Sequence, residues 1–98
     1  MLYSVVQHTK YIHSDGTRYI DKETLCTFAD KKDAKKYIND QFYIMLGLGY
    51  RSVAINSGVY EKTYKINKRQ DFIDKTVEVQ EIVNFVVSET WDSGPGDI

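Results

Sequence analysis

The sequence is poor in residues that cross-link or break a fold, because its 98 residues include one cysteine and one proline. The single cysteine, Cys26, has no partner for an internal disulfide, which is typical of proteins from reducing compartments. The sequence also lacks the roughly 18 consecutive apolar residues of a transmembrane helix, and its first residues do not resemble a secretion signal. We therefore expect a cytoplasmic protein with no membrane segment.

The sequence has no large excess of either charge, because 13 basic residues stand against 14 acidic residues, for a net charge of −1. This balance gives no overall basic field of the kind that nucleic-acid-binding proteins usually show. Hydrophobic residues at 42% and charged residues at 28% are ordinary values for one globular domain. We expect a single α+β domain over residues 1–89 and a flexible acidic tail over residues 90–98, which hold the only proline.

The strongest local signal is the segment Ser14-Asp15-Gly16-Thr17. Asp-Gly favours the positive φ angles of a two-residue type I′ turn, so it predicts a hairpin from about Leu2 to Phe28. With this turn, apolar residues of one strand pair with apolar residues of the other, and a basic residue pairs with an acidic one, which supports the hairpin. The predicted pairs are Ile12–Tyr19, Tyr11–Ile20, Lys10–Asp21, Val6–Leu25, Val5–Cys26 and Tyr3–Phe28.

A helix is predicted over about Lys31–Leu46. Asp30 is a typical N-cap residue, and Gly47 or Gly49 can provide a left-handed exit. One apolar stripe recurs at helical spacing. It consists of Ala34, Tyr37, Ile38, Phe42, Met45 and Leu46.

Three further strands are predicted after the helix. Residues 52–55 and 59–66 are predicted to form a hairpin, and the polar residues 67–75 a loop or one helical turn. Residues 76–88 fit both a helical stripe and period-two alternation, but their five valines favour a strand. The predicted fold class is α+β: an antiparallel sheet of order ββαβββ with one amphipathic helix packed on one face.

No combination of residues points to catalysis. In the predicted register Cys26 and His8 project to opposite faces, and His13 lies roughly 25 Å along the ladder, so neither imidazole can activate the thiol. His8 and His13 also project to opposite faces, and metal-ligand spacings such as Cys-x-x-Cys are missing. Gly47 and Gly49 follow the predicted helix, whereas the glycine-rich loop of a phosphate-binding site comes directly before a helix. These glycines therefore do not indicate a phosphate site. We expect a non-enzymatic protein without a metal or cofactor.

Eight tyrosines favour protein binding, because tyrosine provides a large contact area at a low entropy cost. The hairpin tip is too apolar for one helix to cover, so we expect one of its faces to be open to a partner or to a second copy of the chain. The alternative is that Tyr11 and Ile20 extend the core. The predicted partner-binding residues are Tyr11, Ile12, His13, Arg18 and Tyr19 at the tip, with Lys32, Lys35 and Lys36 on a nearby helix edge. An unpaired strand edge also allows a homodimer by sheet extension.

The same lysines and tyrosines support an alternative function. A basic groove with aromatic side chains can bind single-stranded nucleic acid by stacking the bases. This alternative predicts a nucleic-acid-binding accessory protein with a Lys/Tyr surface. Asp33 and Asp40 dilute the basic stripe of the helix, so we prefer protein binding.

The block from Phe28 to Ile38, FADKKDAKKYI, follows the predicted hairpin. Over residues 1–46 the chain resembles the hairpin and strand-to-helix joint of small bacteriophage-encoded accessory proteins. The resemblance carries no functional residue. It implies a protein that binds and blocks a host protein in the host cytoplasm, as anti-CRISPR and other anti-defence inhibitors do. The near-neutral charge departs from acidic DNA mimics of this kind, so we do not expect mimicry of DNA.

Overall fold

The structure is a computed structural model that describes residues 1–90. Its elements are β1 (Leu2–His13), β2 (Arg18–Phe28), α1 (Lys31–Gly47), β3 (Arg51–Ser52), β4 (Val59–Gln70) and β5 (Ile73–Thr90). The strands form one antiparallel sheet in the order β2-β1-β5-β4-β3. The predicted α+β class and ββαβββ order are therefore confirmed. The tail predicted over residues 90–98 lies outside the described residues, apart from Thr90 at the end of β5.

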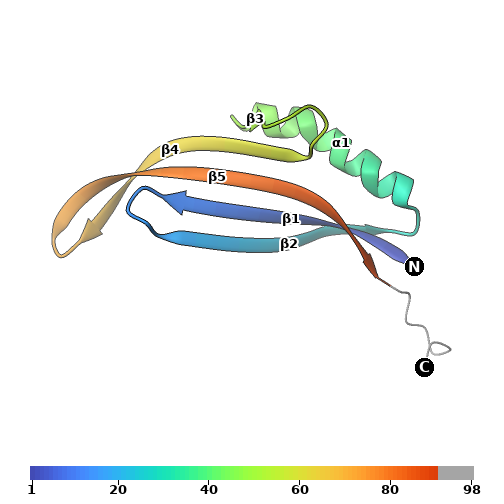
Figure 1. Ribbon diagram of the computed structural model, residues 1–98, viewed down its shortest axis with the longest axis horizontal. Coiled ribbons are helices and arrows are strands. Elements are labelled where there is room, and N and C mark those ends of the chain that lie inside the picture. Colours follow the sequence, from blue (N-terminus) through green and yellow to red (C-terminus); the bar gives the residue numbers. More distant parts are fainter. Residues whose placement is uncertain (91–98) are drawn as a thin grey trace, which may run out of the picture.

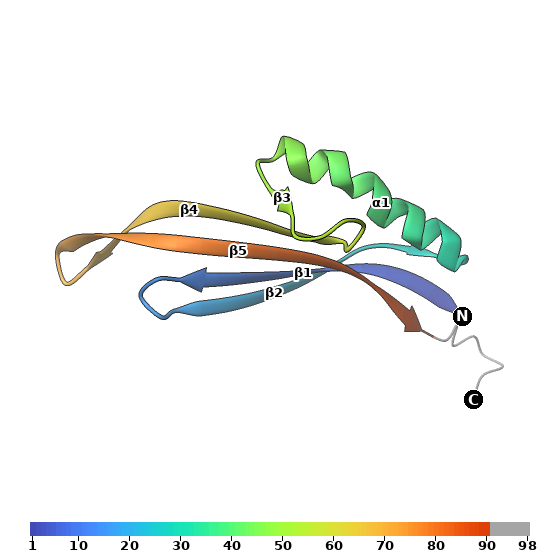
Figure 2. The ribbon, with the colours of Figure 1, turned by 45° about the horizontal axis from the view of Figure 1, so that its top comes forward.

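The sheet is long and thin, and the helix covers only part of it (Figure 1). The described chain measures 59 × 33 × 16 Å along its principal axes. Helix α1 lies over the end of the sheet where β1 begins, while the β4–β5 hairpin runs well beyond the helix (Figure 2). We call this hairpin extension, residues 65–78, the arm.

The buried side chains of the strands all lie on the face that α1 covers. Opposite residues of paired strands share a face, and the register places the buried strand residues on the same side. These residues are Val5, Thr9, His13, Tyr60, Val77, Val79, Val83 and Phe85. Ala34 and Met45 of α1 complete the main cluster around Val5, Tyr60, Val83 and Phe85. The opposite face contains no buried residue of the described strands.

Helix α1 begins and ends close to the predicted residues. The Asp30 carboxylate accepts a hydrogen bond from the backbone N–H of Lys32 at 2.9 Å, as an N-cap should. Tyr37, Ile38 and Phe42 pack against the core as the stripe predicted. Leu46 is the exception, because its side chain remains 42% exposed.

The β1–β2 turn differs from the predicted type I′ turn. Gly16 has a φ of 93°, but Asp15 does not have a positive φ. The N–H of Gly16 donates to the carbonyl of His13 at 3.0 Å, and the N–H of His13 donates to the carbonyl of Thr17 at 2.9 Å. This pattern belongs to a type I turn followed by a glycine bulge, which adds one residue to the loop. The predicted turn type is therefore wrong.

The extra residue shifts the pairing near the turn, and a β-bulge farther along restores it. Tyr11 pairs with Tyr19 instead of Ile20, and the register then changes between Val5 and Val6. Beyond this bulge Val5 pairs with Cys26, as predicted. The predicted pairs Ile12–Tyr19, Tyr11–Ile20, Lys10–Asp21 and Val6–Leu25 are wrong, whereas Val5–Cys26 and Tyr3–Phe28 are confirmed. Leu25 is the extra residue of β2 at this bulge, and it offsets the one-residue shift that the turn introduces relative to the predicted pairing.

The β4–β5 hairpin is longer than predicted. Residues 67–75 are strand except for the turn residues Asp71 and Phe72, so the predicted loop or helical turn is wrong. Gln70 pairs with Ile73 across this turn. The strand alternative for residues 76–88 is confirmed, since they belong to β5. The strand predicted over residues 52–55 is wrong in extent, because β3 contains only Arg51 and Ser52.

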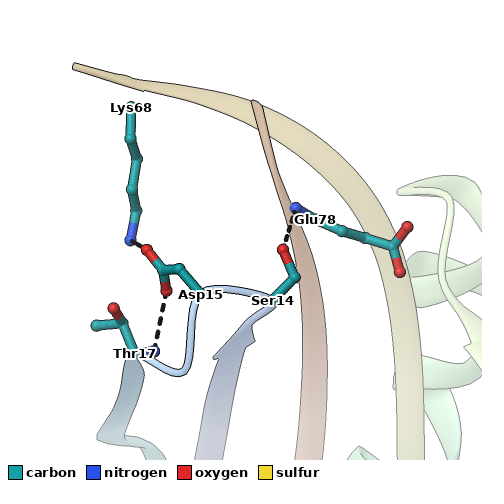
Figure 3. Close-up of polar contacts among 5 residues, drawn as sticks. All are labelled: Ser14, Asp15, Thr17, Lys68 and Glu78. Carbon is teal, nitrogen blue, oxygen red and sulfur yellow. Dashed lines mark hydrogen bonds and ion pairs between the residues drawn. The ribbon is translucent and has the colours of Figure 1, made fainter. Parts of the chain in front are cut away.

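The arm is tied to the β1–β2 turn by polar contacts (Figure 3). The N–H of Ser14 donates to the carbonyl of Glu78 at 2.8 Å, and the N–H of Glu78 donates to the Ser14 hydroxyl at 3.0 Å. The Asp15 carboxylate accepts from the N–H of Thr17 at 2.9 Å and from the Lys68 ammonium at 3.0 Å. The Thr17 and Lys68 donors hold the pKa of Asp15 well below its usual range. These contacts join the arm to the rest of the sheet.

Candidate protein-interaction surface

The hairpin tip distributes the predicted partner-binding residues over two faces of the sheet. Tyr11, His13 and Tyr19 lie on the helix-covered face, while Ile12 and Arg18 lie on the opposite face. His13 is buried, and Tyr11 and Ile12 are half-buried. Tyr19 is 53% exposed, and Arg18 is also exposed. Of the five predicted tip residues, only Arg18 and Tyr19 are therefore exposed to a partner.

The predicted lysines lie far from the hairpin tip. Lys32, Lys35 and Lys36 are exposed near the start of α1. That start follows Phe28, which pairs with Tyr3, eight residues from Tyr11 along β1. Eight residues of strand span about 26 Å. The structure therefore does not join the lysines and the tip into the single surface that the sequence predicted.

Three tyrosines gather around the carboxylate of Glu81, beyond the end of α1. Tyr11 is the cross-strand partner of Glu81, Tyr64 lies on β4, and Tyr50 comes from the segment after the helix. Burial raises the pKa of all three phenols, and the charge and hydrogen bonding of Glu81 raise each pKa further. The phenols thus surround a negative charge in a partly desolvated site.

Lys62 contributes the opposite charge to this tyrosine cluster. Its ammonium lies 5.2 Å from the ring centre of Tyr50 and 5.8 Å from that of Tyr64. It also donates to the backbone carbonyl of Leu48 at 3.0 Å. The side chains of the cluster are half-buried. We interpret it as a polar extension of the core.

The sequence reasoning did not identify Tyr50, Tyr64, Lys62 or Glu81 as a cluster. The spacing of Tyr60, Lys62 and Tyr64 could have placed these three side chains together, because alternate residues of a strand share a face. Tyr50 had no such signal. Its position depends on where the chain turns back after the helix.

Cys26 and the histidines remain apart. Cys26 is half-buried and packs against the core on the helix-covered face, whereas His8 lies on the opposite face, so their predicted separation is confirmed. Burial raises the pKa of the Tyr37 phenol, and the neighbouring Cys26 adds to this shift. Nδ1 of the buried His13 has no hydrogen-bond partner among the described residues. Within residues 1–90, no three His, Cys, Asp or Glu side chains gather as metal ligands.

Exposed apolar side chains are frequent from the second half of α1 to the loop after β3. This part of the chain holds six of the eleven exposed large hydrophobic residues among residues 1–90. The six are Tyr43, Ile44, Leu46, Leu48, Val53 and Ile55. Soluble monomers rarely gather so many exposed apolar side chains without a function.

Part of this surface is a hollow of about 570 Å³, which we call the apolar hollow. Its lining consists of Asn39, Phe42, Tyr43, Ser52, Val53, Ala54, Ile55 and Asn56. Tyr43 is 80% exposed and Ile55 is 93% exposed. Binding sites commonly have this size and combine apolar walls with a few polar groups.

Hydrogen bonds fix the loop that forms one wall of the apolar hollow. The N–H of Val53 donates to the carbonyl of Val59 at 2.9 Å. The hydroxyls of Ser52 and Ser57 donate to the carbonyl of Ala54 at 2.7 Å and 3.0 Å. Because the loop is bonded in this conformation, Ile55 is presented to solvent by the fold itself.

Comparison with models of protein families, with curated proteins and with solved structures found no match for this chain. In the part of the chain that the structure describes, no helix is both long enough and apolar enough to span a bilayer. Function must therefore be inferred from the surface itself.

Proposed function

We propose that this protein is a non-enzymatic protein-binding module and that the apolar hollow is the centre of its contact surface. The observation that carries the proposal is the gathering of six exposed large hydrophobic residues on α1 and the following loop. Burying an aliphatic or aromatic side chain contributes about 1.5–3 kcal/mol. Tyr43, Val53 and Ile55 can therefore supply the few strong contacts that dominate protein interfaces.

A protein partner fits this surface better than a small molecule. Ile44 in α1 and Leu48 after its end are also exposed, and both lie outside the lining of the apolar hollow. A small ligand would fill the hollow and leave these residues in water. A protein surface would cover both.

The first class of partner to test is a bacterial regulatory or defence protein. This choice comes from the resemblance of residues 1–46 to bacteriophage accessory proteins. The protein would then act as an inhibitor in the host cytoplasm, by covering a surface that the host protein needs.

Nucleic-acid binding is the alternative function, and one contact favours it. Lys62 stands over the rings of Tyr50 and Tyr64, which is the combination of charge and aromatic surface that single strands use. Glu81 lies in the same cluster and would repel phosphate. The lysines of α1 lie elsewhere, so protein binding has the stronger support.

The test is affinity capture from a bacterial lysate, with mass spectrometry of the captured proteins. The wild type is compared with Ile55→Asp, which places a charge in the apolar hollow, and with Tyr19→Ala at the hairpin tip. Ile20→Asp is the matched control, because Ile20 is an isoleucine that is 70% exposed on a different part of the surface. Thermal melts confirm that each variant is folded.

We expect Ile55→Asp to lose a partner that the wild type and Ile20→Asp both capture. Tyr19→Ala shows whether the hairpin tip adds to the contact. If Ile55→Asp captures the same proteins as the wild type, the apolar hollow is not the contact surface. Captured nucleic acid that is released by salt would favour the alternative, because phosphate contacts depend steeply on salt.

A further inference from the structure

The sheet face opposite α1, which we call the open face, contains a hollow of about 260 Å³. It lies over three neighbouring strands, because β1 pairs with β2 on one side and with β5 on the other. The one helix within residues 1–90 lies on the other side of the sheet (Figure 2). The lining of the hollow consists of His8, Thr9, Lys10, Ile20, Ile82 and Asn84. We call this site the cationic hollow.

Three basic side chains surround the cationic hollow. Lys10 pairs with Ile20, so Arg18 and Lys22, on either side of Ile20 in β2, are the diagonal neighbours of Lys10 on the open face. Such neighbours are roughly 7–8 Å apart, within reach of long side chains. Lys10, Arg18 and Lys22 are all exposed, and none of them forms an ion pair within residues 1–90.

The acidic residues nearest in sequence and in space do not compensate these charges. Asp21 and Glu23 adjoin Lys22 in the sequence, but the alternation of β2 places them on the helix-covered face. Glu61 lies on the open face of β4, where it forms an ion pair with Arg51. The cationic hollow therefore has a net positive charge.

Two half-buried polar side chains add hydrogen-bond donors to the cationic hollow. His8 and Asn84 are cross-strand partners, and both belong to the lining. Within residues 1–90 neither side chain forms a hydrogen bond with another residue. A neutral imidazole can donate one N–H and a side-chain amide two. These donors are therefore available to a ligand that enters the hollow.

The charge and the donors favour a phosphate group as the occupant. A phosphate ester carries about −1.5 to −2 charges at pH 7 and three strong acceptor oxygens, whereas a carboxylate has one charge and two oxygens. Several cations and two neutral donors match the phosphate better. Lysine is also a common phosphate ligand in proteins.

The apolar walls and the volume limit the rest of the ligand. Ile20 is 70% exposed and Ile82 is half-buried, so an apolar group above them would remove both from water. About 260 Å³ is roughly the volume of eight or nine molecules of liquid water. The ligand is therefore a small organic molecule rather than a drug-sized one.

The open face is less suited to a nucleic-acid strand. Single strands bind by stacking their bases on aromatic side chains. Within residues 1–90, every aromatic residue of the strands lies on the helix-covered face. A strand on the open face could use its phosphates but could not stack its bases.

We propose that the cationic hollow binds a small organic phosphate. Its phosphate group lies against Lys10 and Lys22, and its apolar part lies against Ile20 and Ile82. The cationic hollow and the apolar hollow share no lining residue. The proposal is therefore independent of the proposed function and goes beyond it.

Nuclear magnetic resonance of the labelled full chain tests this proposal, with phenyl phosphate as the probe. We expect the backbone amide signals of His8, Lys10, Ile20 and Asn84 to shift and to saturate with a dissociation constant of about 1 mM, as for other small ligands. Inorganic phosphate lacks the apolar part and phenol lacks the charge, so each should bind about tenfold more weakly. Equal binding by either of them, or shifts centred elsewhere, would overturn the proposal.

Two charge reversals separate a site from general attraction. Lys10→Glu should weaken the binding of phenyl phosphate by about tenfold or more. Lys35→Glu is the matched control, because Lys35 is also an exposed lysine but lies on α1. Its affinity should equal that of the wild type, and the spectrum of each variant shows whether it is folded. Equal weakening by the two reversals would overturn the site.

A single-stranded oligothymidine is the last probe. It should bind no more tightly than phenyl phosphate, because the open face offers no aromatic ring for its bases. Much tighter binding that falls steeply with salt would overturn the small ligand and favour a nucleic-acid backbone.

Two variants distinguish the failure of this proposal from that of the proposed function. Ile55→Asp should lose the captured protein and keep phenyl phosphate. Ile20→Asp should keep the captured protein and lose phenyl phosphate, because its carboxylate would repel the anion. If Ile20→Asp and Lys10→Glu bind phenyl phosphate like the wild type while Ile55→Asp loses its partner, only the phosphate site is wrong.

Discussion

The substitution Val77→Ala tests whether the arm is a folded part of the domain. Val77 is 0% exposed, although it lies outside the main cluster around α1. The change removes two carbons, for about 1.6 kcal/mol of transfer free energy at about 0.8 kcal/mol each. The cavity adds to this loss, so we expect the free energy of unfolding to fall by about 2–3 kcal/mol. For a domain of this size the melting temperature should fall by about 10–20 °C.

Thermal and urea unfolding with circular dichroism measure this effect. Val83→Ala is the matched comparison, because Val83 is 1% exposed and belongs to the helix-covered core. Ile73→Ala is the control on the same arm, and at 67% exposed it should cost less than about 0.5 kcal/mol. Equal losses for Val77→Ala and Val83→Ala mean that one cooperative unit contains both. A loss below about 0.5 kcal/mol for Val77→Ala alone would refute a rigid arm.

Three further predictions concern other parts of the sheet. Gly58→Ala should destabilise the protein by about 1–3 kcal/mol in thermal melts, because φ is 70° and a Cβ there would lie 3.2 Å from the Phe85 carbonyl oxygen. The lowered pKa of Asp15 stabilises the fold above the unfolded-state pKa of about 3.9, and this contribution is lost as the pH falls below it. The stability difference between the wild type and Asp15→Asn, measured by urea unfolding, should therefore shrink between about pH 5 and pH 2; a constant difference would show that the Asp15 contacts do not form. In an ultraviolet titration Tyr50 should ionise above the usual tyrosine pKa, and Glu81→Gln should bring that pKa down; an unchanged titration would remove Glu81 from the cluster.

The helix could be predicted from the sequence because its signals are local. Asp30 caps the first turn through its own side chain, and the apolar stripe of α1 repeats at helical spacing. The strands were also predictable wherever one face is buried, as in the alternation around Val83. These features depend on residues within a few positions of one another.

The turn and the arm could not be predicted because their conformation depends on distant contacts. Asp-Gly suits both a type I′ turn and a type I turn with a glycine bulge, since Gly16 has a positive φ in each. The bonds from Ser14 and Asp15 to the arm are formed with the second geometry. The polarity of residues 67–75 indicated a loop. In the structure these residues form a strand pair that no helix covers, so their side chains face water and can be polar.

The apolar hollow was not predicted because periodicity cannot show how far a helix covers a sheet. Leu46 fits the apolar stripe of the predicted helix, yet its side chain remains exposed in the last turn of α1. Ile55 was predicted to lie in a strand, but the hydrogen bonds of its loop turn it outward. The hairpin-tip residues were predicted from composition, and their division between two faces required the observed register.

Photo-cross-linking in cells tests the central claim most directly. A photoreactive amino acid replaces Ile55 in the apolar hollow or, as the control, Ile20 on β2. We predict cross-links to a bacterial protein from position 55 and none above background from position 20. Equal yields from the two positions, or none from position 55, would contradict a protein contact centred on the apolar hollow.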